Sequence, residues 1–180
     1  WEYFEKCKDD VKGEYKARRA WTALNLGQSL LDAGYYQEAL SFFERSEALW
    51  TELDRKNELA LVDDQKGRLL LTLRDYDLAF EHLTESLNVH KNNKDYNLKA
   101  WVQKHLGMYY EAVGKNRKAF NSYEKAIQNF NFLDDYFGEA KTLSYLILFL
   151  FRKGQYKKFF LKLRQLFDLV GFMGNHLGDG

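Results

Sequence analysis

A 40-residue spacing of small residues constrains the fold of this chain more than any other feature of its sequence. Gly27, Gly67 and Gly107 lie 40 residues apart, and three alanines beginning at Ala39 repeat at the same interval. A fixed period of about 20 to 50 residues is the signature of structural units stacked in an array. One such unit cannot bury its apolar face alone, so neighbouring units are expected to share a continuous core.

The composition favours helices around a packed interior. Hydrophobic residues make up 46% of the 180 residues, which is enough for a core and argues against disorder. The chain contains no proline, and strand-like alternation is scarce, so we expect an all-α protein. With 14 Phe and 12 Tyr, the core must be built from large side chains that face small ones.

Charge, cysteine content and hydropathy exclude several classes of protein. The net charge of +1 gives no general attraction to nucleic acid, and no apolar run is long enough to insert across a membrane. The single cysteine, Cys7, excludes an intramolecular disulfide and suits a reducing compartment, so we expect a cytoplasmic protein. The sequence shows no signal peptide. It starts at Trp1 rather than at a methionine, and in the middle of a repeat, which predicts a fragment or processed form.

Apolar residues recur at helical spacing within each 40-residue unit. Spacings of three and four residues place side chains on one face of a helix. One row that we assign to the core of the first helix of each unit contains Leu26, Lys66, Leu106 and Leu146. We predict a single array over residues 1–172, with helix pairs at 14–52, 57–92, 96–132 and 136–171.

The two ends of the chain depart from these pairs. The segment YFEK at residues 3–6 is similar to FFER at residues 42–45, so residues 1–12 are predicted to form the second helix of a truncated repeat. In that arrangement Trp1, Phe4 and Cys7 would pack on the helix that follows. At the other end, four glycines among the last ten residues predict a flexible tail over residues 173–180.

Glycines mark the turns inside the helix pairs. Gly34, Gly114 and Gly154 lie where a first helix must end, which suits a left-handed C-cap. Arg74 occupies the same place in the second pair, so we expect its turn to differ slightly. The glycines and alanines of the 40-residue series fall where two helices would cross closely.

The order of small residue, turn glycine, tyrosine, alanine and large apolar residue resembles the tetratricopeptide repeat. Leu26 and Gly27 followed by Tyr36, Ala39 and Phe43 fit this pattern well. The spacing is similar to that of the 40-residue subclass, which includes kinesin light chain, spindle scaffold proteins and bacterial peptide-sensing regulators. The resemblance implies a right-handed α-solenoid of about four helix-turn-helix repeats plus a leading helix. It also implies a protein- or peptide-binding module of a larger scaffold or regulator.

The fourth repeat departs from the family pattern. Ile147 stands where glycine is expected and Phe159 where alanine is expected, and no repeat has the usual proline near its end. We expect these changes to loosen or tilt the last helix pair.

The resemblance also implies where a ligand would bind, because the first helices of tetratricopeptide arrays line the concave face. Counting along the repeat frame gives a groove that mixes apolar anchors with a few charges, which suits a peptide or a helix. The residues are Gln28, Leu31, Asp64, Arg68, Leu71, Lys104, Met108, Glu111, Ser144, Leu148 and Phe151. The alternative is that some of these residues belong to the core, since the frame could slip by one position.

One family function is excluded by the residues in the groove. Chaperone-binding arrays hold a terminal carboxylate with Lys, Asn and Arg on successive first helices. Here the corresponding positions include Leu24, Gln28 and Trp101, and Asp64 would repel a carboxylate. We therefore predict a different ligand.

No catalytic constellation occurs in the sequence. There is no phosphate-binding loop, no HExxH and no Gly-x-Ser-x-Gly motif, so we expect no enzyme and no cofactor. His82 and His90 are about two helical turns apart, which is too far for one metal ion without further ligands. We interpret them as ordinary surface or half-buried residues.

The C-terminal part of the chain is basic and apolar. From Lys141 to Phe167 there are seven basic residues and no acidic one, with phenylalanines and leucines between them. This pattern fits a docking face for an acidic partner or a membrane surface. The alternative is a final helix covered by a further helix of the parent chain or by a second copy, which makes self-association the second functional hypothesis.

Overall fold

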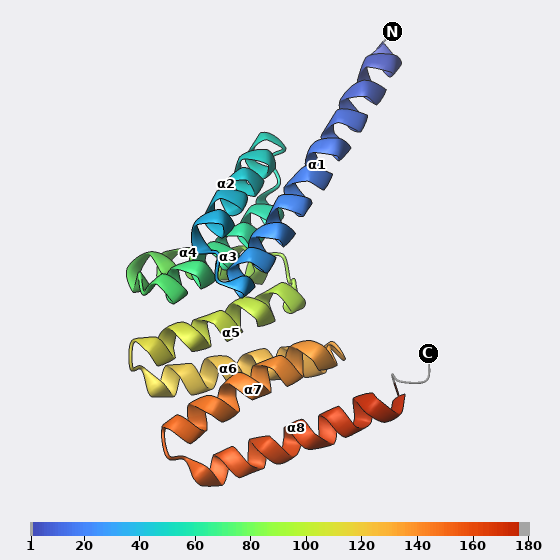
Figure 1. Cartoon of the computed structure of the whole chain (residues 1–180). Coiled ribbons are helices and arrows are strands. Elements are labelled where there is room, and N and C mark those ends of the chain that lie inside the picture. The colour runs from blue at the N-terminus through green and yellow to red at the C-terminus, as the bar shows by residue number, and fades with distance from the viewer. Residues whose placement is uncertain (1, 177–180) are drawn as a thin grey trace. The chain divides into compact units, whose positions relative to one another are not determined.

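The computed structural model describes the backbone of residues 2–176 and the side chains of residues 12–175 (Figure 1). Within this range the chain forms eight α-helices in tandem and no strand. Successive helices pack as pairs, so the predicted all-α solenoid class of tetratricopeptide-like repeats is confirmed. The packing of Trp1, Phe4 and Cys7 lies outside the described side chains.

The chain divides into two units, residues 1–89 and 90–180, which are described separately. The N-terminal unit contains α1 (Glu2–Ala33), α2 (Tyr36–Glu52), α3 (Lys56–Leu73) and most of α4 (Tyr76–Asn92). The C-terminal unit contains the end of α4 followed by α5 (Tyr96–Ala112), α6 (Asn116–Phe132), α7 (Tyr136–Arg152) and α8 (Tyr156–His176). Two of the first helices begin with an aspartate cap: Asp95 accepts from the Leu98 amide at 3.0 Å, and Asp135 from the Gly138 amide at 2.8 Å.

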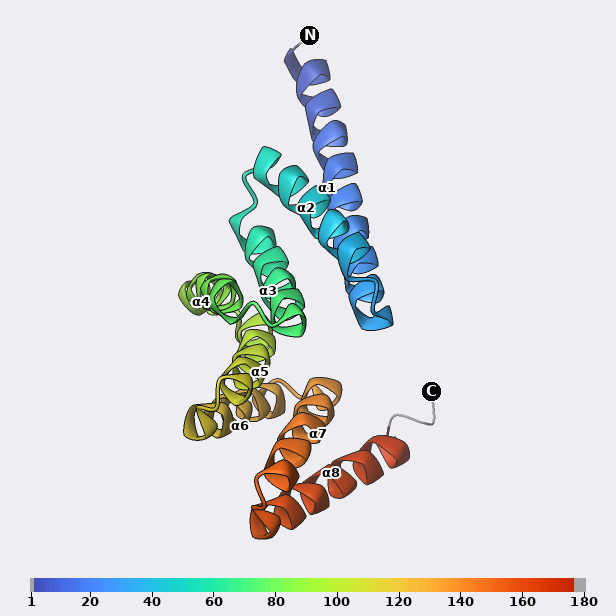
Figure 2. The same ribbon diagram turned by 60° about the vertical axis from the view of Figure 1, so that its left-hand side comes forward.

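Both chain ends differ from the sequence prediction. Residues 2–12 do not form a separate helix but continue directly into α1, which projects past the end of α2 (Figures 1 and 2). The helix runs through Gly13, where no neighbouring atom lies within 4 Å of an added Cβ, and the Glu14–Arg18 ion pair at 2.6 Å supports its next turn. Residues 173–176 are helical as the end of α8, whereas we predicted a flexible tail from residue 173. Residues 177–180 lie outside the described part.

A residue in the left-handed conformation closes every connection between successive helices. These residues follow one another at intervals of 20: Gly34, Asp54, Arg74, Lys94, Gly114, Asp134 and Gly154. Each turn makes the same two main-chain bonds, as when the Gly34 amide donates to Leu31 at 3.2 Å and the Tyr35 amide to Leu30 at 2.9 Å. The three glycine caps are therefore confirmed.

The expectation of a different turn at Arg74 is wrong. Arg74 has φ 65°, and its amide and that of Asp75 donate to Leu71 and Leu70 at 3.2 and 2.9 Å. The backbone bonds define this cap, and a side chain at the left-handed position only adds strain to it.

The small residues of the 40-residue series allow close helix crossings, as predicted. A Cβ on Gly27 would lie 2.6 Å from Phe43 Cε1, and a Cβ on Gly107 would lie 2.7 Å from the Tyr123 ring. In the fourth pair the larger Ile147 is buried among core residues of α6 and α7. Each unit thus has its own core, built from rings set against glycine and alanine.

The predicted core row of the first helices is only partly buried. Leu106 and Leu146 are buried, but Leu26 is 45% exposed. Among the described residues, Leu26 has no preceding second helix against it, whereas Leu146 packs with residues of α6. Lys66 forms an ion pair with Glu47 of α2 at 2.6 Å, which explains how a lysine occupies this row.

Candidate protein-binding surface

In the N-terminal unit, a charged contact joins the first helices of neighbouring repeats. Arg68 on α3 forms an ion pair with Asp32 on α1, and its Nη1 lies 3.4 Å from Gln65 Oε1. The Arg68 guanidinium is thus oriented by two groups while part of it stays exposed. Gln28 and Leu71 are half-buried on the same two helices.

Three residues predicted for the groove are buried. Leu31 belongs to the core of the N-terminal unit together with Leu24, because the α1 face that carries them packs against α2 and α3. Asp64 is buried on α3, and its carboxylate accepts a hydrogen bond from Gln65 at 3.1 Å. Lys104 is buried on α5 beneath aromatic rings. The alternative that some groove residues belong to the interior therefore holds for these three.

In the C-terminal unit, two lysines and aromatic rings form a cluster on α5 and α7. Lys104 Nζ lies 4.3 Å from the centroid of the Trp101 ring and 5.5 Å from that of Tyr145. Lys141 Nζ lies 5.7 Å from the Trp101 ring. We call Trp101, Lys104, Lys141 and Tyr145 the lysine–aromatic cluster. Cation–π contacts of this kind orient the lysine side chains.

Counting along the repeat frame also places Trp101 and Lys141 on the inward rows of the first helices, together with Lys104, but it does not include Tyr145. The period supplies this prediction, since Trp101 and Lys141 occupy the same position in successive repeats. Residues 40 apart on neighbouring first helices face each other across the α5–α7 contact.

Glu111 on α5 links three helices of the C-terminal unit. Arg152 Nη2 of α7 donates to Glu111 Oε1 at 2.7 Å, and the Tyr123 hydroxyl of α6 donates to Oε2 at 3.2 Å. Burial raises the pKa of the Tyr123 hydroxyl above its usual value, and the Glu111 carboxylate adds to the effect. Glu111, which the sequence predicts for the groove, is therefore first a structural residue.

Exposed apolar side chains lie on α7. Leu148 and Phe151 are 55% and 56% exposed, Ser144 is exposed on the same helix, and Met108 of α5 is half-buried. The Phe151 ring is oriented by Phe159, whose centroid is 5.6 Å away. Exposed apolar side chains one helical turn apart make this side of α7 a candidate surface for another molecule.

Comparisons with known proteins agree with this architecture. Two family models, both described as Tetratricopeptide repeat, match residues 19–53 and residues 58–131. The chain belongs to the tetratricopeptide repeat superfamily. No curated protein matches the sequence.

The fold of this tetratricopeptide array is also similar to that of a solved structure described as "Crystal structure of BtubC (BKLC) from P. vanneervenii". The TM-score is 0.71 and the identity 16%, over 87% of the present chain. The likeness covers 65% of the other chain, so the array spans about two thirds of the length of that protein.

The basic stretch of the array is partly neutralised by acidic neighbours. Lys162 of α8 forms an ion pair with Glu124 of α6 at 2.7 Å, and Arg152 is held by Glu111. The outer side of α8 also exposes large apolar side chains: Phe167 is 69% exposed, whereas Ile127, its equivalent one repeat earlier, is 4% exposed.

Two of the described histidines have structural surroundings rather than those of a metal site. His82 Nδ1 lies 2.9 Å from Asp63 Oδ1, so a structural contact accounts for it, and His90 is fully buried rather than at the surface. Among residues that the structure describes, no group of three or more His, Cys, Asp or Glu is placed to hold a metal ion. Within the same residues, none of the helices combines the length and the apolar character needed to cross a membrane.

Proposed function

We propose that this protein is a protein- or peptide-binding module of a larger scaffold or regulator, and that it binds through the exposed faces of its first helices. Tetratricopeptide repeats generally mediate protein–protein interaction, and their all-helical fold is typically not catalytic. The observation that carries the proposal is the pair Leu148 and Phe151, exposed on α7 of the same unit as the lysine–aromatic cluster. We propose a cytoplasmic location, supported by the single cysteine.

The chemistry of this face defines the ligand class. Leu148, Phe151 and the half-buried Met108 supply apolar anchors, and Lys141 supplies a positive charge that its aromatic neighbours orient. A ligand segment with two apolar side chains and a nearby carboxylate is complementary to this arrangement. In the N-terminal unit, Gln28, Arg68 and Leu71 form a second, more polar patch that we assign to the same role.

The test is capture of partners from a lysate of the source cells with the wild-type protein and two variants. Leu148→Asp places a charge on the proposed face, and Leu161→Asp places the same charge on α8, where Leu161 is 66% exposed. We expect a captured protein to be lost with Leu148→Asp and kept with Leu161→Asp, while both variants melt like the wild type. Capture that is unaffected by Leu148→Asp, or abolished only by Leu161→Asp, contradicts the proposal.

The second candidate function is self-association through α8. It is supported by the exposed apolar side of this helix, where Phe160, Phe167 and Val170 remain in water. Sedimentation at increasing concentration should show a dimer that Phe160→Glu dissociates. Phe132→Glu, at the end of α6, is the matched control because Phe132 is also exposed. A monomer at every concentration argues against this candidate.

A further inference from the structure

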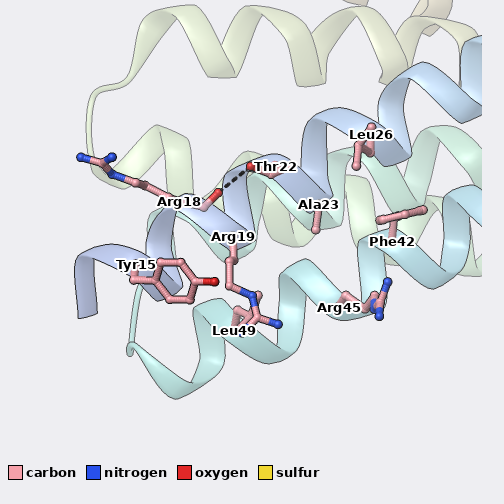
Figure 3. Close-up of a pocket in the computed structure, with 9 residues that line it drawn as sticks. All are labelled: Tyr15, Arg18, Arg19, Thr22, Ala23, Leu26, Phe42, Arg45 and Leu49. Carbon is pink, nitrogen blue, oxygen red and sulfur yellow. Dashed lines mark hydrogen bonds between the residues drawn. The ribbon is translucent and has the colours of Figure 1, made fainter. Parts of the chain in front are cut away.

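A hollow of about 470 Å³ lies between α1 and α2 in the N-terminal unit (Figure 3). Ala23, Leu26 and Leu49 supply its apolar lining, and Tyr15 and Phe42 stand towards opposite ends of it, with Arg19 between them. The hollow is separate from the face proposed above, which consists of other residues.

The equivalent surface in the C-terminal unit is covered by a helix. Adding three repeats of 40 residues to Arg18 gives Gly138 of α7, against which the Phe130 ring of α6 packs so closely that a Cβ would lie 2.5 Å from it. Phe42 likewise corresponds to Lys162 of α8, 120 residues later. Lys162 Nζ lies 2.7 Å from Glu124 Oε1, so α6 also contacts this position. The C-terminal unit therefore shows how a helix sits on this kind of surface.

The exposure of the hollow reflects the absence of such a helix among the described residues. Leu26 is 45% exposed, and its equivalent Leu146 is 0% exposed beneath α6. Thr22 is exposed, and its equivalent Thr142 is buried. The lining thus has the apolar pattern of a helix-packing surface that is left open to solvent.

The charge of the hollow selects the kind of helix. Three arginines line it, Arg18, Arg19 and Arg45, and no acidic residue does. Arg18 forms an exposed ion pair with Glu14 at 2.6 Å. The Arg19 and Arg45 guanidinium groups lie 5.8 and 5.6 Å from the rings of Tyr15 and Phe42, and neither has a carboxylate within ion-pair distance among the described residues.

Glu52 at the end of α2 is already paired. Glu52 lies 2.5 Å from Lys16, and this hydrogen bond is the main cause that lowers the pKa of the Glu52 carboxyl. The interaction of Glu52 with Arg19 is weaker than that with Lys16, so a carboxylate of a molecule that fills the hollow can pair with these arginines.

We propose that the hollow between α1 and α2 binds an acidic amphipathic helix of a partner protein, in the position that α6 takes on α7 and α8. The apolar side of that helix would cover Leu26 and Leu49, and its carboxylates would meet Arg19 and Arg45. A second copy of this chain is a poorer occupant. Its open helix α8 carries Lys157, Lys158 and Arg164, so like charges would face each other.

The experiment measures the binding of two helical peptides to the whole chain by fluorescence anisotropy. The acidic probe is the α6 sequence, residues 116–132, with Arg117, Lys118 and Lys125 replaced by glutamate; the reference probe is the unaltered sequence. Both keep Tyr123, Ile127 and Phe130, so they differ only in charge. We expect the acidic probe to bind at least about tenfold tighter, with an affinity that falls as salt rises.

Two double variants test whether the acidic probe binds at the hollow between α1 and α2. Arg19→Glu with Arg45→Glu should weaken binding of the acidic probe by about tenfold or more. Lys153→Glu with Lys157→Glu makes the same change of charge at the exposed α7–α8 turn and should leave binding unchanged. A thermal melt checks that both variants are folded.

Three results would overturn the proposal. One is equal binding of the two probes, or no binding of the acidic one. The second is an affinity of the acidic probe that the two arginine substitutions do not change. The third is a dimer of the free chain that Arg19→Glu with Arg45→Glu dissociates, since a second copy would then be the occupant.

Discussion

Arg152 on α7 reaches Glu111 on α5 across neighbouring repeats, with 2.7 Å between Nη2 and Oε1. The other oxygen of the same carboxylate accepts a hydrogen bond from the hydroxyl of the buried Tyr123. The two partners differ in environment, because Arg152 is largely exposed while Tyr123 is fully buried. Glu111 therefore stabilises the C-terminal unit mainly through Tyr123.

This difference predicts unequal effects of two substitutions. Glu111→Ala leaves the buried Tyr123 hydroxyl without its acceptor and should lower the free energy of unfolding by about 1–3 kcal/mol. Arg152→Ala removes only the solvent-screened partner and should cost less than about 1 kcal/mol. Urea denaturation of the two variants measures both. Equal losses would show that the ion pair, rather than the hydroxyl, is the stabilising contact.

The raised pKa of Tyr123 predicts a loss of stability in alkali. In the unfolded chain the hydroxyl ionises near its ordinary value of about 10, while burial and Glu111 keep it protonated in the folded chain to higher pH. Above pH of about 10 the unfolded state thus binds fewer protons, and stability falls as pH rises. Tyr123→Phe should make this fall less steep in denaturation curves between pH 9 and 11. Parallel pH profiles would contradict the assignment.

The close crossing of α5 and α6 predicts that Gly107 does not tolerate a side chain. Gly107→Ala would bring a Cβ to 2.7 Å from the fully buried Tyr123 ring, and such overpacking costs about 1–3 kcal/mol. Gly13→Ala is the matched control, since Gly13 is helical and nothing lies within 4 Å of an added Cβ. It should stabilise the chain by about 0.5–1 kcal/mol through helix propensity.

The control also tests the continuity of α1. If Gly13→Ala destabilises the protein in thermal unfolding, the helix does not run through Gly13. The separate helix expected over residues 1–12 would then be favoured.

The left-handed turn at Arg74 predicts a stabilising substitution. Arg74→Gly removes the steric cost that an L-residue carries at φ 65°, which is about 1 kcal/mol. Thr72→Gly, two residues earlier in the exposed end of α3, should instead destabilise by a similar amount. In thermal unfolding, the melting temperature should rise for Arg74→Gly and fall for Thr72→Gly. A change of the same sign in both variants would contradict the left-handed cap at Arg74.

The fold could be predicted from the sequence wherever the period and the residue type act together. The glycine caps at Gly34, Gly114 and Gly154 were predicted because glycine signals a left-handed turn by itself. The same turns at Asp54 and Lys94 carry no such signal, since hydrogen bonds between backbone groups impose them on ordinary residues. These turns can be located only from their spacing, since each lies 20 residues from a glycine cap or from another such turn.

The candidate site was harder to predict than the fold. Leu31 and Lys104 are predicted to face a ligand, but both are buried. A shift of one residue in the repeat frame is enough to move a position from the surface of a helix to its core side, and the packing of neighbouring helices decides which side is covered. The lysine–aromatic cluster joins Trp101 to Lys141, a pairing that depends on how two first helices stack.

Ligand recognition by the exposed face of α7 is tested most directly by site-specific photocrosslinking. A photoreactive phenylalanine is introduced at Leu148 in one sample and at Leu161 in another, and crosslinked proteins are identified after irradiation of the source-cell lysate. We predict a partner protein crosslinked from position 148 and not from position 161. Crosslinks from position 161 alone, or none from position 148, would contradict the proposed binding face.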